Sequence, residues 1–165
     1  MIVLIWITEG TWRSTVDAAR AQLSSGGGAG EAEVRLLYVT DDQVADAAHA
    51  AFAGLLGRGH PERDPGDRME ELGRTAAAEL LEAAAARLGH PAVRLHRHGR
   101  VEHEVVRAAD GVDLLICARD GDRDRLGPHS LGHATRFVVD HAPCAVLLVW
   151  PVPAPGLDSL PPPPG

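Results

Sequence analysis

The chain has 165 residues, of which 45% are apolar and 4% aromatic, and its formal net charge is -7 at pH 7. This length and apolar content favour one globular domain with a sizeable core, whereas the negative charge argues against a nucleic-acid-binding protein, because phosphate contacts require a basic face. The 2 cysteines, Cys117 and Cys144, form no CxxC motif or disulfide framework, which favours a cytoplasmic protein.

The N-terminal part predicts two buried strands with a helix between them. The apolar run Ile2–Ile7 predicts a central strand, and it is too short and lacks the basic flank for a secretion signal or a membrane span, so no membrane partner is expected. A helix follows and ends at Ser24–Gly28, and Val34–Val39 is the second strand. The apolar positions of that helix are Trp12, Val16, Ala19 and Leu23.

Two further helices are predicted after the second strand. Asp41 or Asp42 can cap the first of them. Its apolar positions are Val44, Ala48, Phe52 and Leu55. A surface loop, Arg58–Gly66, separates it from the strongest helix, Asp67–Leu88, which ends before Gly89. The apolar face of this long helix comprises Met69, Leu72, Ala76, Leu80 and Ala83.

The C-terminal half alternates short strands with short helices. Ala92–Leu95 predicts a third strand, followed by a polar loop, His96–Arg100. Val101, Val105 and Ala108 then mark a short helix that ends at Gly111. The remaining elements are a fourth strand over Val112–Cys117, a helix over Ala134–His141 and a fifth strand over Ala145–Trp150.

This alternation predicts an α/β fold, a single-domain, doubly wound, five-stranded parallel sheet with helices on both faces, because right-handed crossovers place helices on either side. Residues 1–150 are expected to form the domain. From Pro151 to Gly165 the chain is rich in proline, and this tail is expected to be extended and mobile.

The stretch between the fourth and fifth strands is the part of the chain most suited to holding a ligand. Ligands of parallel sheets lie beyond the carboxyl ends of the strands, at the point where the strand order reverses. Gly121 and Gly132 allow the backbone to approach a phosphate, and the N–H groups of Gly132, His133 and Ala134 favour an anion. Ser130 and Thr135 can add hydroxyl donors, and the alternative is a surface turn in which the glycines only close the chain.

The remaining walls of this candidate site come from the ends of the first, second and fourth strands. Thr8–Gly10 follow the first strand, Val39 and Thr40 end the second, and Cys117 and Ala118 end the fourth. The candidate ligand-binding residues are Thr8, Glu9, Gly10, Val39, Cys117, Ala118, Gly121, Ser130, Gly132, His133 and Ala134.

From Ile2 to Trp150 the order and content of the chain resemble the universal stress protein family. The resemblance is strongest from Val112 onward, in VDLLICARDG and in the phrase HAPCAVLLV that leads into the last strand. It implies a flavodoxin-like fold, and the expected strand order is 3-2-1-4-5. Members that bind ATP typically carry G-x2-G-x9-G-[ST] after the fourth strand, and this chain has Ala118, Gly121, ten residues, and then Gly132-His133.

The departures from the family pattern lie in the site itself. Ala118 replaces the first glycine, the spacer is one residue longer, and His133 replaces the final Ser or Thr. Thr8 stands where the family usually has an Asp that faces adenosine, and Glu9 is its nearest substitute. The resemblance implies a regulatory module that binds ATP or AMP, with or without Mg²⁺, or a related phosphate ligand, without turnover. The alternative is a dimeric protein-interaction module with a decayed pocket, and a weak nucleotide hydrolase ranks third.

The fifth strand predicts the mode of assembly. Ala145–Trp150 is unbroken apolar sequence at the expected edge of the sheet, and an open apolar edge favours pairing with another chain. Family members commonly dimerise through their last strands, so the resemblance implies a homodimer. The alternative is a monomer in which the tail from Pro151 covers this edge; the prolines lack N–H groups, which favours the dimer.

Three other patterns carry weaker functional readings. The cluster His96, His98, Glu102 and His103 has zinc or nickel ligand types, but a solvated polar loop is the better interpretation. Arg119–Arg125 alternates in charge sign; its arginines can hold an anion, its three Asp residues oppose a polyphosphate without Mg²⁺, and a self-paired loop is favoured. No GxSxG motif occurs, and Cys117 suits the core, so no catalysis is expected.

Overall fold

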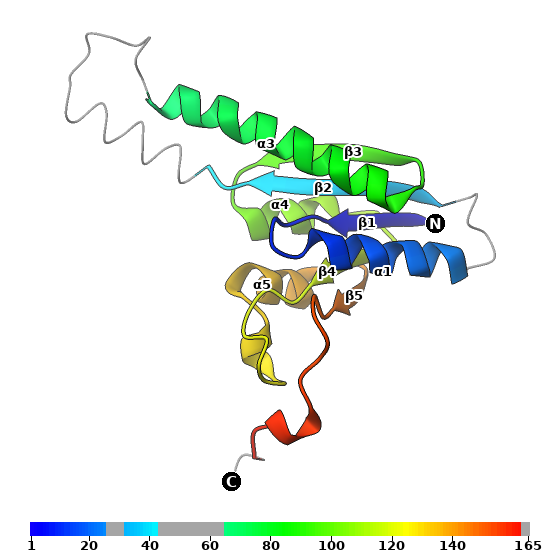
Figure 1. Cartoon of the computed structure of the whole chain (residues 1–165). Coiled ribbons are helices and arrows are strands. Elements are labelled where there is room, and N and C mark those ends of the chain that lie inside the picture. The colour runs from blue at the N-terminus through cyan, green and yellow to red at the C-terminus, as the bar shows by residue number, and fades with distance from the viewer. Residues whose placement is uncertain (26–31, 43–64, 163–165) are drawn as a thin grey trace.

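The computed structural model describes residues 1–25, 32–42 and 65–162, and they form an α/β fold (Figure 1). Five strands make one sheet in the order β3-β2-β1-β4-β5, and every neighbouring pair is parallel. The strands are β1 (Ile2–Trp6), β2 (Glu33–Thr40), β3 (Ala92–His98), β4 (Leu114–Ala118) and β5 (Ala145–Val149). The predicted fold class and strand order are therefore confirmed.

The described helices cover both faces of this sheet (Figure 1). They are α1 (Trp12–Ser25), α3 (Pro65–Leu88), α4 (Val101–Ala108) and α5 (His133–His141). Successive side chains of a strand point to opposite faces, so Ile5 packs with α1 and α3, whereas Leu4 packs with α4 and α5. The predicted helix through Val44–Leu55 lies outside the described residues, as does most of the loop that follows it. That loop ends earlier than expected, because α3 begins at Pro65.

The apolar face predicted for α3 is displaced by one position from the buried face, although the predicted Leu80 is half-buried against the core. The face that packs against the sheet comprises Ala77, Leu81, Ala84 and Leu88. Of the predicted face, Met69 is 41% exposed and Leu72 is 64% exposed. The alanine-rich sequence has two adjacent apolar stripes, so helical spacing alone did not distinguish them. In Figure 1 the N-terminal end of α3 extends past the sheet, which explains why its larger apolar side chains find no core there.

The third strand is longer than predicted. His96–His98, expected in a polar loop, continue β3 and pair with Tyr38–Thr40 of β2. The Thr40 hydroxyl and His96 Nε2 share a hydrogen bond of 2.7 Å. Because β3 is an edge strand, it tolerates polar side chains, and a search for apolar runs in the sequence therefore does not detect its polar end.

The tail after β5 is not wholly extended. A short 3-10 turn, Leu157–Ser159, follows Gly156, and the Ser159 hydroxyl accepts a hydrogen bond of 3.1 Å from the Leu126 N–H. The tail therefore contacts the loop between β4 and α5. No helix in the described part of the chain has both the length and the hydropathy to cross a membrane.

Candidate functional site

Three segments lie at the carboxyl ends of β1, β2 and β4. They are the β1–α1 turn at residues 8–11, the end of β2, and the loop over residues 119–132 between β4 and α5. Arg123 of this loop approaches the turn, with its Nη2 atom 3.9 Å from the position that a Cβ would take at Gly10. Because β2 and β4 flank β1, this is where the strand order reverses.

The polar groups of the β1–α1 turn already have partners. The Thr8 carbonyl accepts hydrogen bonds from the N–H groups of Thr11 at 3.2 Å and Trp12 at 3.0 Å, which starts α1. The Thr8 and Thr11 hydroxyls lie 2.5 Å apart. Glu9 Oε1 accepts a hydrogen bond of 3.1 Å from the Tyr38 hydroxyl, and burial together with this carboxylate raises the pKa of Tyr38. The Glu9 carboxylate is thus turned toward β2.

Gly121 closes a hairpin within the loop. Its N–H donates to the Ser130 carbonyl at 3.0 Å, and the Asp122 N–H donates to the His129 carbonyl at 2.8 Å. A Cβ at Gly121 would lie 2.3 Å from the His129 carbonyl oxygen. The glycine is therefore required by the path of the loop, which is the structural alternative left open above.

Gly132 holds a carboxylate at the start of α5. Its N–H donates to Asp120 Oδ1 at 2.7 Å, and a Cβ there would lie 2.8 Å from Asp120 Oδ2. Helix N-termini carry partial positive charge and attract anions. The position expected for a ligand phosphate is thus occupied by a side chain of the loop itself.

The two expected hydroxyl donors are buried instead of facing a ligand. Ser130 and Thr135 are 1% and 2% exposed. The Ser130 hydroxyl donates to the Gly127 carbonyl at 2.7 Å and accepts a hydrogen bond from Arg119 Nη1. His133 is exposed and Ala134 is half-buried at the first turn of α5.

Arg119 connects the loop to the end of β5. Its N–H donates to the Val149 carbonyl at 2.9 Å, and its guanidinium lies 4.7 Å from the centroid of the Trp150 ring. Its buried Nε atom has no hydrogen-bond partner among the described residues. Sequence reasoning considered Arg119 as an anion ligand or as part of a self-paired loop, and nothing in the sequence showed that it would lie over the Trp150 ring.

Cys117 and Ala118 are buried at the end of β4. Burial raises the pKa of the Cys117 thiol to about 12, with a smaller contribution from Asp120. A thiol with this pKa stays protonated near neutral pH and is a poor nucleophile.

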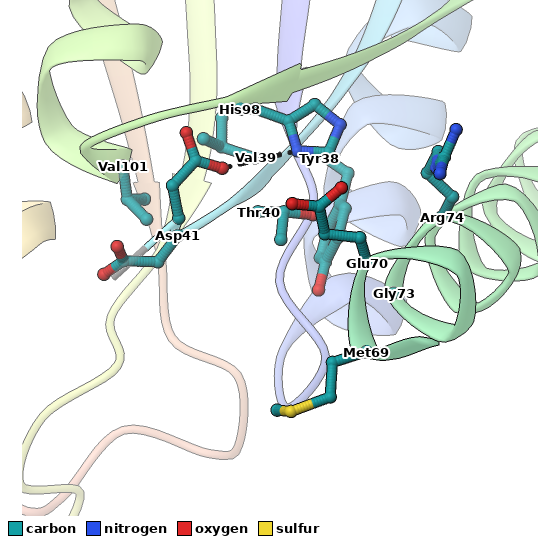
Figure 2. Close-up of a pocket in the computed structure, with 11 residues that line it drawn as sticks. Tyr38, Val39, Thr40, Asp41, Met69, Glu70, Gly73, Arg74, His98 and Val101 are labelled. Atoms are coloured by element: carbon teal, nitrogen blue, oxygen red, sulfur yellow. Dashed lines mark ion pairs between the residues drawn. The ribbon is translucent and has the colours of Figure 1, made fainter. Parts of the chain in front are cut away.

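A cavity of about 740 Å³ lies beside the carboxyl ends of β2 and β3. Its described lining is Tyr38, Val39, Thr40, Asp41, Asp42, Met69, Glu70, Gly73, Arg74, His98 and Val101. Figure 2 shows Thr40, Glu70 and His98 near the middle of the view, with Arg74 on the opposite side from Val101. Among the predicted site residues, Val39 lines this cavity. Sequence reasoning missed it because its lining comes from β2, α3, β3 and α4, which are far apart in the sequence.

The histidine cluster forms no metal centre in the part of the chain that is described. No three His, Cys, Asp or Glu side chains there converge on one point. The His96 and His98 rings lie 4.3 Å apart, His98 Nδ1 is 3.5 Å from Asp42 Oδ1, and Glu102 pairs with Arg100 at 2.9 Å. Burial, followed by the charges of His98 and Arg74, lowers the pKa of His96.

Comparison with known proteins identifies relatives of this chain. The model of the universal stress protein family matches residues 27–149. No curated protein sequence matches the chain significantly. Hypothetical protein MJ0577, the subject of a structure-based assignment of biochemical function, superposes with a TM-score of 0.66 and 19% identity, over 90% of this chain and 94% of that one.

Two solved universal stress proteins are similar as well. UspA from Lactobacillus plantarum has a TM-score of 0.58 and 20% identity, over 90% of this chain and 97% of its own. A universal stress protein in complex with cAMP has a TM-score of 0.58 and 15% identity, over 92% of this chain and 98% of its own. At these identities the likeness to solved structures establishes the shared fold.

Proposed function

Because the chain belongs to the universal stress protein family, we propose that it is a regulatory module that binds an adenine nucleotide, or a related phosphate ligand, without turnover. The observation that supports this proposal is the approach of the Arg123 guanidinium to Gly10, which brings a basic side chain of the glycine-containing loop beside the β1–α1 turn. A basic side chain beside two loops at a strand-order reversal suits a phosphate-bearing ligand. The cAMP complex of a structural neighbour supports a nucleotide as the ligand class.

The absence of turnover is supported by the groups nearest the loop. The Cys117 thiol is buried and has a pKa of about 12, and the Ser130 hydroxyl is buried between Arg119 and Gly127. Neither is placed to act as a nucleophile, because a nucleophile needs access and an activating base.

Calorimetric titration with adenosine, cAMP, AMP and ATP tests this proposal. Gly132→Val adds a branched side chain at a position where even a Cβ atom would contact the Asp120 carboxylate. It should therefore lower the affinity for the nucleotide at least about tenfold. Gly73→Ala is the matched control, because no atom lies within 4 Å of its Cβ position and it lines the other cavity. If the unmutated protein binds none of the four compounds at millimolar concentration, the proposal is refuted.

A dimeric interaction module that binds no nucleotide is the second candidate. It is favoured by the hydrogen bonds that already engage the N–H groups of Gly121 and Gly132. In this candidate the partner is a second copy, paired through the edge strand β5, whose residues Val146–Val149 are half-buried. The same β5 pairing is compatible with nucleotide binding, so we propose a homodimer in either case.

A further inference from the structure

The Asp120 carboxylate lies at the N-terminus of α5 in the manner of a bound anion. Oδ1 accepts the 2.7 Å hydrogen bond from the Gly132 N–H, and Oδ2 lies 2.8 Å from the Cβ position of Gly132. A larger residue at Gly132 would push the carboxylate away. The Asp120 carboxylate thus supplies a hydrogen-bond acceptor for the N–H of Gly132, the residue that precedes the first turn of α5.

Two arginines of the loop and of α5 are committed to other contacts. Arg119 bonds Ser130 and stacks on Trp150, and Arg136 bonds the Pro128 and Leu131 carbonyls. Arg123 approaches Gly10 and makes no ion pair with another residue in the described ranges. At the junction of loop and turn, the Arg123 guanidinium is therefore available to a ligand, whereas the Asp120 carboxylate already accepts the Gly132 hydrogen bond.

A nucleoside triphosphate does not fit this arrangement. To reach the Gly132 N–H, its phosphates would have to displace the Asp120 carboxylate and then lie beside it, where like charges repel. A ligand with at most one negative charge can pair with Arg123 and leave Asp120 in place.

We propose that Asp120 is the specificity-determining residue of the site, taking the place of a ligand phosphate and restricting the ligand to an adenine nucleoside or cyclic mononucleotide. This inference rests on the proposed function, since it concerns the same site. It assigns to one side chain the preference for weakly charged ligands over ATP.

Two substitutions separate the effect of the Asp120 charge from the effect of its side chain filling the position beside the Gly132 N–H. Asp120→Asn keeps an oxygen that can accept the Gly132 hydrogen bond but removes the charge, and Asp120→Ala clears the position. Asp124→Asn is the matched control, because it removes the same charge from the same loop and its carboxylate makes no contact in the described ranges. All four proteins are titrated calorimetrically with adenosine, cAMP, and ATP with and without Mg²⁺.

The unmutated protein should bind cAMP or adenosine at least about tenfold more tightly than ATP, since contact between like charges is costly. Asp120→Asn should reduce this preference, Asp120→Ala should reduce it further, and Asp124→Asn should leave it unchanged. Equal binding of ATP and cAMP by the unmutated protein, or a preference unchanged in both Asp120 variants, would overturn the inference and leave the proposed function standing. No binding by any of the proteins would refute the proposed function instead. If the Asp120 variants bind ATP and the unmutated protein binds none of the compounds, the result would support the exclusion of phosphate by Asp120 and refute nucleotide binding by the unmutated protein.

Discussion

At the scale of single residues, the two glycines of the loop serve different purposes. Gly121 is confined by the backbone of His129 and Ser130, whereas Gly132 is confined by the Asp120 side chain. A side chain can move and a hairpin backbone cannot do so cheaply. The sequence showed that both positions permit close approach, but not what approaches them, because that depends on the path of the intervening loop.

Gly121→Ala should destabilise the protein by roughly 1–3 kcal/mol, because the new Cβ overlaps a carbonyl oxygen 2.3 Å away. The measurement is urea unfolding followed by circular dichroism. Gly73→Ala provides the control: it lies in α3 with open space around its Cβ position, so it should stabilise the helix by up to about 1 kcal/mol. Equal stability of the two variants would contradict this account of the hairpin.

At the scale of elements, the apolar strands and α1, α4 and α5 were predictable because one periodicity dominates each of them. The polar end of β3 was not, since His96–His98 gain their strand conformation from pairing with β2. Likewise, the orientation of α3 depends on which of two alanine-rich stripes meets the sheet. Both errors concern long-range contacts that local patterns do not contain.

The burial of His96 predicts that stability falls in mild acid. Its pKa is lowered from the ordinary value of 6.5, chiefly by burial. The unfolded chain therefore takes up a proton before the folded one, so the free energy of unfolding decreases as pH falls below 6.5. Urea unfolding at several pH values from about 7.5 to about 5.5 measures this slope.

His96→Gln retains a hydrogen-bonding group beside the Thr40 hydroxyl but does not titrate, so it should have a shallower dependence on pH. The exposed His129 offers a control, since His129→Gln should keep the original slope. A slope that is identical in His96→Gln and the unmutated protein would show that His96 does not cause it.

At the scale of the whole molecule, the fold was predictable and the state of the site was not. Five apolar runs separated by helical segments leave few arrangements other than a doubly wound sheet. The family motif indicated a candidate ligand region, but not the hydrogen bonds that join Asp120 to Gly132 and Arg119 to Ser130 across the loop. Such hydrogen bonds depend on the conformation of the loop in the folded protein, and no periodic pattern in the sequence indicates them.

The β5 edge predicts a homodimer. Light scattering at micromolar concentration should give about twice the mass of the chain, and Leu148→Lys should shift it toward the monomer, because a charge disfavours an apolar strand pair. Leu148 also packs against the core on the α4 and α5 side, so circular dichroism must show that the variant remains folded. A monomeric unmutated protein over this range would contradict the prediction.

The contact between the tail and the loop has a practical consequence for the design of these measurements. The Ser159 hydroxyl accepts a hydrogen bond from the Leu126 N–H. A purification tag or fluorophore fused at the carboxyl terminus would therefore be attached to a segment that contacts the loop between β4 and α5. Met1, in contrast, is exposed beside the amino end of the central strand β1, away from the carboxyl ends of the strands that this loop follows (Figure 1). Labels, surface tethers and fusion partners therefore belong at the amino terminus.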